Sequence, residues 1–230
     1  MTTSMTIIDH KSMCSQRRIL SILCLLLAPT CVLFGLFGKT TNVGGWWKSI
    51  SATFFCNSNI LMIGLLVAIA IYFFSYKGYD IRDRICSIIE AVSSLGIVCF
   101  PCNSIENVPE RIGLFNLPNN ISMIIHCVFA GILFVAFGFN ILFLFTLSVY
   151  NPTKEKKVRN VIYRVCGIII LTFCVIQGVT STIWKWYPEW YPNTLVNEFI
   201  MLLAFGIAYL IKSESIRILN DKNQKTFAKI

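Results

Sequence analysis

The side chains best suited to chemistry lie where polar groups interrupt or flank long apolar runs. Glu198 and His126 each lie about one helical turn inside the predicted outer end of such a run, and Ser51, Asn57 and Asn59 flank the same end of another. A carboxylate beside an imidazole could bind a cation or an amine-bearing head group, or work as an acid and base pair. We therefore expect an outward-facing polar pocket. The alternative is that both groups lie wet at the interface and only hydrogen-bond neighbouring loops.

A C-x-x-C pair, Cys99 and Cys102, lies at the end of the third apolar run. At an outer membrane face such a pair is typical of quinone-linked disulfide oxidoreductases, in which the thiolate pKa is lowered at a helix end. Cys56 and Cys127 are predicted near the same face and could form a second pair. Because the chain has ten cysteines, one such spacing is unsurprising, and redox catalysis is an alternative hypothesis.

Three more polar residues lie within apolar runs. Glu90 could be a proton or cation site, since ionisable groups at membrane depth are costly and usually functional. Asn140 and Gln177, near the middle of their runs, are expected to form interhelical hydrogen bonds. The structural alternative for Glu90 is an ion pair with a base near the membrane surface: Arg84, Arg164 or Lys212.

Metal, nucleotide and nucleic-acid functions find little support. Only two histidines are present, and His10 lies in the N-terminal tail, on the opposite predicted side from His126. A catalytic zinc site would have to be built mainly from cysteine or carboxylate, so no metal and no cofactor is expected. Phosphate-binding glycine loops and nucleophile-elbow motifs are absent from the sequence. The net charge of +9 is spread between apolar runs, which fits anionic lipid better than nucleic acid.

Composition indicates a membrane protein. Hydrophobic residues make up 56% of the 230 residues and charged residues 13%, about half the charged fraction of a soluble domain. A helix of about 20 residues spans the roughly 30 Å of a hydrocarbon core. We predict one all-α domain, residues 1–230, a polytopic bundle of six transmembrane helices: about 19–37, 57–76, 85–101, 121–149, 160–183 and 195–212.

Charge and tryptophan distribution predict the orientation. With six spans, 16 of the lysines and arginines fall on the side that holds both termini and 4 on the other. Under the positive-inside rule, both termini are cytoplasmic and the protein lies in the cell (inner) membrane. The tryptophans fall in the opposite loops, as an outer interfacial belt requires: Trp46, Trp47, Trp184, Trp186 and Trp190.

Several segments together resemble a family of bacterial six-span (hexahelical) membrane proteins of unknown function, which is distantly similar to the DRAM-like proteins. They are SISATFF (49–55), FSYKGYD (74–80), Phe100-Pro101, His126, LFLFT (142–146), NPTKEKKVRNVIYRVCG (151–167) and NEFIMLLAFGIAYLIKSE (197–214). The resemblance implies the six-span topology and supplies no reaction. In that family a histidine and an arginine follow SIS, whereas this chain has Thr53-Phe54-Phe55-Cys56-Asn57, which implies a lost or altered activity if those groups carried it.

These observations predict a non-enzymatic protein that binds or moves a lipid or small polar solute through an outward-facing site near Glu198 and His126. Its expected partners are membrane lipids and that ligand, with no nucleic acid. Two alternatives stay open. One is a membrane enzyme, either a thiol oxidoreductase using Cys99 and Cys102 or a lipid-modifying enzyme using His126 and Glu198. The other is a structural or regulatory membrane subunit.

Overall fold

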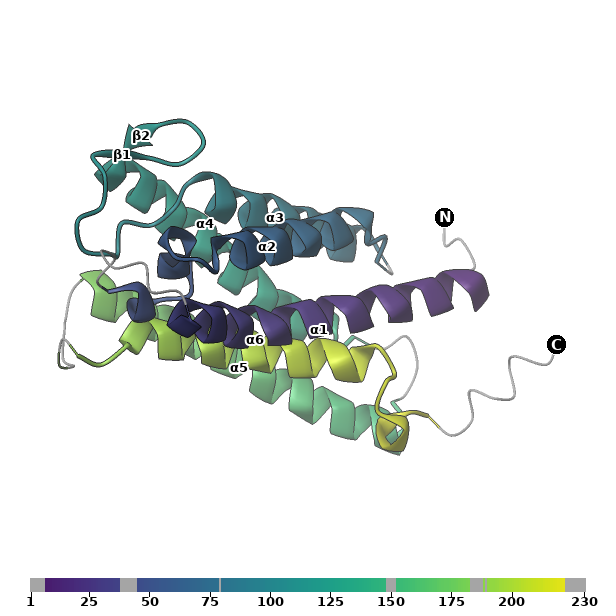
Figure 1. Cartoon of the computed structure of the whole chain (residues 1–230). Coiled ribbons are helices and arrows are strands. Elements are labelled where there is room, and N and C mark those ends of the chain that lie inside the picture. The colour runs from purple at the N-terminus through teal and green to yellow at the C-terminus, as the bar shows by residue number, and fades with distance from the viewer. Residues whose placement is uncertain are drawn as a thin grey trace.

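The computed structural model describes residues 7–37, 45–78, 80–147, 152–182, 188 and 190–221. The chain is all-α, as predicted, apart from one short two-stranded ribbon (Figure 1). Its long helices are α1 (Ile7–Phe37), α2 (Asn59–Ser75), α3 (Ile81–Cys99), α4 (Asn119–Phe139), α5 (Lys154–Thr182) and α6 (Asn193–Lys212). Short helical turns are η1 (Trp46–Lys48), η2 (Ser51–Phe55), the π-helical segment η3 (Asn140–Leu144) and η4 (Arg217–Leu219).

Four helices are long and apolar enough to cross a membrane: α1, α4 with its π-helical extension, α5 and α6. Helix α2 is also apolar but has only 17 residues. Helix α3 is absent from that group because one of its faces is polar. It buries Asp83, Ser87 and Glu90, while Ile85 and Ile89 on the opposite face are exposed.

The six helices form a closed ring in chain order. Each helix packs against the helices before and after it, and α6 packs against α1 to complete the ring. The start of α1 and the end of α6 therefore lie at the same end of the bundle (Figure 1). Aromatic side chains fill the centre of the ring, where the rings of Phe137 and Phe205 lie 3.9 Å apart and those of Phe205 and Tyr209 lie 4.2 Å apart.

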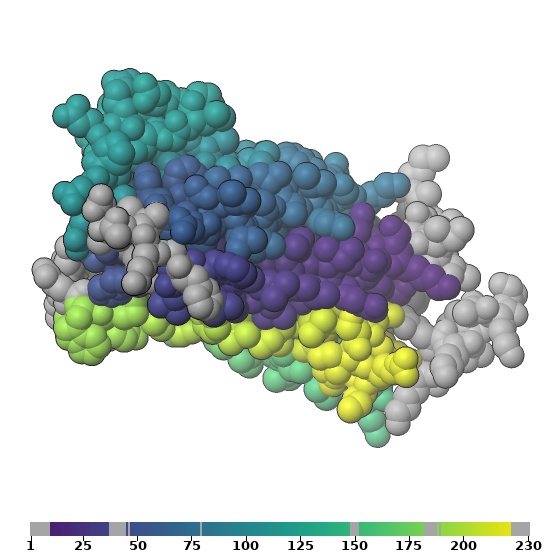
Figure 2. Space-filling view, in the orientation of Figure 1, coloured from purple at the N-terminus to yellow at the C-terminus, as the bar shows by residue number. Residues whose placement is uncertain are grey.

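Between α3 and α4 the chain forms a small antiparallel ribbon, β1 (Arg111–Ile112) with β2 (Leu117–Pro118). Gly113 follows β1 with φ of 77°, and a Cβ there would lie 2.7 Å from the carbonyl oxygen of Cys99, so only glycine fits. The ribbon stands out from the end of the bundle opposite the start of α1 (Figure 2). The sequence did not predict this ribbon.

The helices differ from the predicted runs mainly at their ends. Helix α1 begins at Ile7, twelve residues before the apolar run, because its polar first turns pack against the rest of the bundle: Met13, Cys14 and Arg17 are buried there. The long run 121–149 is described as far as 147, with α4 continued by η3 to Leu144. Residues 148–151 and the tryptophan-containing segment 183–187 lie outside the described residues.

Candidate functional site

Glu198 on α6 is held by the turn that precedes η2. The backbone N–H of Ile50 donates to Oε2 of Glu198 at 2.6 Å. The turn itself is fixed by its own side chains, since the N–H of Ala52 donates to the Ser49 hydroxyl at 2.9 Å and the Thr53 hydroxyl donates to the Ile50 carbonyl at 2.6 Å. Serine and threonine favour such local turns because their hydroxyls satisfy nearby backbone groups. The S-I-S-A-T sequence thus places Ile50 and Ser51 next to the first half of α6.

His126 on α4 is fully engaged by two partners. Its Nδ1 lies 2.7 Å from the carbonyl oxygen of Phe100, and its Nε2 lies 3.0 Å from the Ser51 hydroxyl. A carbonyl can only accept, so Nδ1 carries the proton and Nε2 accepts the hydrogen of Ser51. No hydrogen bond or ion pair joins the buried imidazole to Glu198 within the described residues. His126 therefore orients Ser51 and joins α4 to the end of α3.

A cavity of about 40 Å³ lies beside Glu198 and Ser51, inside the ring of helices. By volume it holds roughly three water molecules. Ser94, whose hydroxyl donates to the Glu90 carbonyl at 2.8 Å, also lines it. The remaining lining is apolar apart from the thiol of Cys24: Cys24, Leu27, Ile50, Met62, Leu66, Ile69, Ile97, Ala130, Leu133, Phe134, Phe137 and Leu202.

The polar groups on this cavity present acceptors. Glu198 uses Oε2 for Ile50, and Oε1 has no hydrogen-bond partner among the described residues. The Ser51 hydroxyl donates its hydrogen to His126, so the lone pairs of its oxygen can still accept hydrogen bonds. A ligand matching these two groups brings hydrogen-bond donors, and a positively charged donor gains most from a carboxylate. The site is chemically suited to a small cation or an amine.

Two of the predicted binding residues lie elsewhere. Asn57 is exposed and Asn59 half-buried, and neither lines the cavity. Of the five residues proposed from the sequence, Glu198 and Ser51 thus line the cavity, and His126 accepts a hydrogen bond from Ser51. The backbone N–H of Ile50 and the hydroxyl of Ser94 were not found from the sequence, because neither group carries a signal before the turn and the helix pairing are known.

Glu90 forms a second buried polar site, nearer the end of the bundle that holds the start of α1. The amide of Asn140 donates to Oε1 of Glu90 and to the Tyr209 hydroxyl, each at 3.1 Å. Glu90 Oε2 and Asn140 Oδ1 are buried with no hydrogen-bond partner in the part of the chain that the structure describes. The expected pairing of Glu90 with a base is not observed, since Asn140 is its only side-chain partner in the described chain. A charge buried there would need a proton or a cation to neutralise it.

Asn140 begins the π-helical segment η3. In such a segment an extra residue is inserted into the turn, and π-helical turns often occur at functional sites. Here the segment continues α4 and carries the Asn140 amide between α3 and α6. The predicted interhelical hydrogen bond of Asn140 is confirmed, with two partners on different helices.

Gln177 also bonds between helices, as predicted. Its Nε2 donates to the Thr194 hydroxyl at 2.9 Å, and its Oε1 accepts from the Asn197 amide at 2.8 Å. Asn193 adds a bond to Thr180 at 3.1 Å. All of these bonds join α5 to α6, with every named side-chain group engaged. This network is explained by packing between the two helices.

Cys99 and Cys102 are both free thiols. Cys99 is the last residue of α3, the carboxyl end of a helix, whereas thiolates are stabilised at amino ends. Cys102 is 2% exposed, and its burial raises the pKa of the thiol to about 11. Of the proposed second pair, Cys56 is buried and Cys127 exposed, and both are free. These surroundings are the opposite of those that activate a redox thiol.

Comparisons with known proteins give no match. No protein-family model matches the sequence, and neither a curated protein nor a solved structure matches the chain. The geometry above is therefore the basis for a functional proposal.

Proposed function

We propose that this chain is an integral membrane protein with six spans and cytoplasmic termini that binds or moves a small polar solute or a lipid head group carrying a donor or a positive charge. The carboxylate of Glu198 carries this proposal, because it lines the cavity with one oxygen fixed by Ile50 and the other without a hydrogen-bond partner among the described residues.

The distribution of polar and apolar faces supports six spans. Helix α3 turns Glu90 and Ser94 inward and exposes Ile88 and Val92. In water this arrangement would be costly, whereas in a bilayer apolar side chains face lipid and polar side chains face the bundle. Helix α2, at 17 residues, reaches about 26 Å and spans a bilayer core with slight thinning.

The charge asymmetry supports the orientation. The 16 lysines and arginines on the side of the termini include Arg82, Arg84 and Arg159, which stay close to the ends of α3 and α5. Placing that side in the cytoplasm follows the positive-inside rule. The resemblance to bacterial six-span membrane proteins, which implies the same topology, is part of this proposal. A reporter fused to the C-terminus should be active in the cytoplasm; activity only outside it would reverse the orientation.

The size and lining of the cavity restrict the ligand. A space of about 40 Å³ admits a group of a few heavy atoms, such as an ammonium or a short amine, and not a whole lipid. Met62, Leu66 and Phe134 would contact the apolar part of that group, while Glu198 and Ser51 receive its donors. A lipid would place only its head group here.

Native mass spectrometry of the gently solubilised protein tests this function. Glu198→Gln removes the charge and keeps an acceptor for Ile50, and Glu106→Gln is the matched control because Glu106 is exposed in the loop after α3. Small amines and amine-bearing lipids are added separately, which distinguishes the two sources. We expect a defined adduct in the wild type and in Glu106→Gln that is lost in Glu198→Gln. Identical spectra for all three proteins would refute the proposal.

The enzyme alternatives have less support. A lipid-modifying acid and base pair would need His126 and Glu198 to reach one reacting group, but both imidazole nitrogens are occupied by Phe100 and Ser51. A thiol oxidoreductase would need an accessible thiolate, and Cys102 is buried with a raised pKa. No specific contact favours either reaction over ligand binding.

A further inference from the structure

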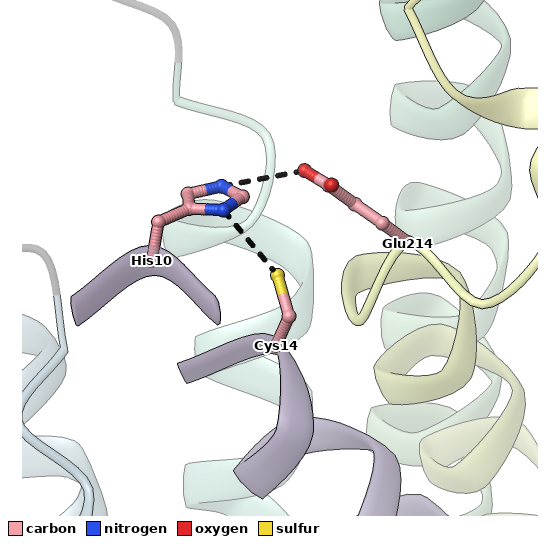
Figure 3. A group of neighbouring side chains, drawn as sticks. All are labelled: His10, Cys14 and Glu214. Atoms are coloured by element: carbon pink, nitrogen blue, oxygen red, sulfur yellow. Dashed lines mark hydrogen bonds and ion pairs between the residues drawn. The ribbon is translucent and has the colours of Figure 1, made fainter. Parts of the chain in front are cut away.

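Three potential metal ligands converge at the end of the bundle that holds the start of α1. The imidazole Nε2 of His10 lies 3.4 Å from Oε1 of Glu214, and its Nδ1 lies 3.8 Å from the sulfur of Cys14. One ligand atom from each residue can be chosen so that all three lie within 4.8 Å of one another. Figure 3 shows the imidazole between the carboxylate and the thiol.

The fold brings these residues together from the two ends of the chain. His10 and Cys14 are four positions apart on α1 and so occupy the same face of the helix. Glu214 follows the end of α6 at Lys212, with a left-handed backbone (φ of 58°). Its carbonyl accepts a hydrogen bond from the Asn220 amide at 2.7 Å, which helps to hold the turn. Because α1 packs against α6, the turn meets the helix face.

Imidazole, thiolate and carboxylate together are a zinc-type ligand set. Zinc bonds of about 2.0 to 2.3 Å in a tetrahedron place ligand atoms roughly 3.3 to 3.8 Å apart. Those two contacts involve different imidazole nitrogens, whereas one ion takes only one of them. With one ligand atom from each residue, all three lie within 4.8 Å of one another, so a side-chain adjustment of about 1 Å brings them to tetrahedral spacing. Cys14 is buried, whereas the side chains of His10 and Glu214 are 32% and 35% exposed, so an ion can enter from solvent and keep a water ligand.

The neighbouring charges are compatible with a divalent ion. Three cations lie near Cys14: Arg17, Arg18 and Lys212. Each is engaged by an acceptor, since Arg17 Nε donates to the Tyr76 hydroxyl at 3.0 Å, Arg18 Nε to the Ser215 hydroxyl at 2.8 Å and Lys212 Nζ to the Phe145 carbonyl at 3.3 Å. A thiolate and a carboxylate carry two negative charges, which balance the two positive charges of a divalent ion. On the side that the basic residues assign to the cytoplasm, the thiol would stay reduced and available.

We propose that His10, Cys14 and Glu214 bind one divalent transition-metal ion of the zinc type, with water completing the coordination. The bound ion would tie the first turns of α1 to the turn after α6 and so brace the closure of the helix ring. This site lies apart from the cavity at Glu198, so its test does not depend on the proposed function.

Cobalt(II) is the probe, because a thiolate ligand gives a near-ultraviolet charge-transfer band and tetrahedral coordination gives strong visible bands. Chelator-treated protein without a histidine tag, kept in a non-thiol reductant, is titrated with cobalt(II) and then with zinc. We expect one saturating equivalent of cobalt(II), displaced by zinc. In Cys14→Ser the charge-transfer band should disappear. His10→Gln and Glu214→Gln should weaken binding at least about tenfold.

Cys174→Ser is the matched control, because Cys174 is a half-buried thiol on α5 outside the cluster. It should bind cobalt(II) like the wild type. Zinc should also raise the melting temperature of the wild type and of Cys174→Ser but not that of Cys14→Ser, whose metal-free melting curve reports whether it folds. Absence of stoichiometric binding, or equal binding by wild type and all three ligand variants, would overturn the proposal.

Discussion

The backbone N–H of Ile50 and the carboxylate of Glu198 are joined at 2.6 Å across 148 positions of sequence. This bond fixes the loop before α2 to α6. It satisfies a donor of a residue that is only 5% exposed, and it orients the carboxylate that borders the cavity. One carboxylate oxygen thus has a structural role, which leaves the other for a ligand.

Glu198→Ala should destabilise the protein, whereas Glu198→Gln should retain most of the stability. The alanine variant leaves the Ile50 N–H without its acceptor, which costs about 1 to 3 kcal/mol for a buried donor. The glutamine variant keeps a carbonyl oxygen at the same place. Thermal unfolding in detergent micelles without added ligand measures both. Equal melting temperatures for the two variants would show that the bond to Ile50 contributes nothing.

Glu90 and Asn140 should be energetically coupled. Their hydrogen bond of 3.1 Å is buried, and single alanine variants each leave a polar partner unsatisfied. In a double-mutant cycle, the loss in Glu90→Ala/Asn140→Ala should be smaller than the sum of the single losses by about 0.5 to 1.5 kcal/mol. Additive losses would contradict the bond.

Glu90→Gln serves as the matched variant in that cycle. A glutamine keeps the acceptor for Asn140 Nδ2 and adds a donor that can reach toward Asn140 Oδ1, which has no partner. Its stability should therefore stay within about 1 kcal/mol of the wild type. If Glu90 binds a cation, the melting temperature of the wild type depends on added salt cations. Glu90→Gln should remove that dependence, whereas a conservative change elsewhere should retain it.

The sequence predicts the positions of the helices well and the side-chain contacts between them poorly. Apolar runs mark the helices because a bilayer requires continuous apolar surface, and Glu198 and Ser51 are recognisable as polar groups at the same predicted end of their runs. Asn57 looked equivalent to Ser51 but faces outward, since the turn at Ser49 determines which side chains point inward.

Partners distant in the sequence depend on which helices touch. The pairing of His10 with Glu214 requires the contact between α1 and α6, which no local pattern specifies. Glu90 was expected to find a base, but the π-helical segment brings the Asn140 amide to it instead. Arg17 is one of the 16 basic residues counted on the side of the termini, yet it is 1% exposed and its Nε donates to the Tyr76 hydroxyl at 3.0 Å. Its spacing from Leu20, Ser21 and Cys24 places it on the same buried face of α1.

Gly206→Ala should separate α1 from α6, whereas Gly131→Ala should not disturb packing. A Cβ at Gly206 would lie 2.4 Å from Cγ of Leu25, so the Leu25 side chain or one of the two helices must shift. At Gly131 nothing lies within 4 Å of the added Cβ. Both variants gain the same helix propensity of alanine, about 1 kcal/mol, so their difference isolates the clash.

We expect Gly206→Ala to be less stable than Gly131→Ala by about 1 to 3 kcal/mol. Unfolding of both proteins in the same mixed micelles measures the difference. Equal stabilities would mean that Leu25 moves aside without cost and that the contact between α1 and α6 is loosely packed.

Asp221 should make stability depend on pH in the acid range. Burial alone would raise the pKa of this carboxyl, but hydrogen bonds from the Thr153 hydroxyl and, at 2.7 Å, the Arg159 guanidinium outweigh burial and hold the pKa below its ordinary value. A lowered folded-state pKa means that the contribution is complete above the ordinary value of about 3.9 and is lost as the pH falls below it. Asp221→Asn should cost up to about 1 kcal/mol at pH 7, and the gap should narrow as the pH falls toward 3. Melting temperatures of both proteins from pH 7 to pH 3, with the exposed-site variant Glu106→Gln as control, measure this gap. A gap of the same size at both ends of the range would show that Asp221 acts through packing and not through its charge.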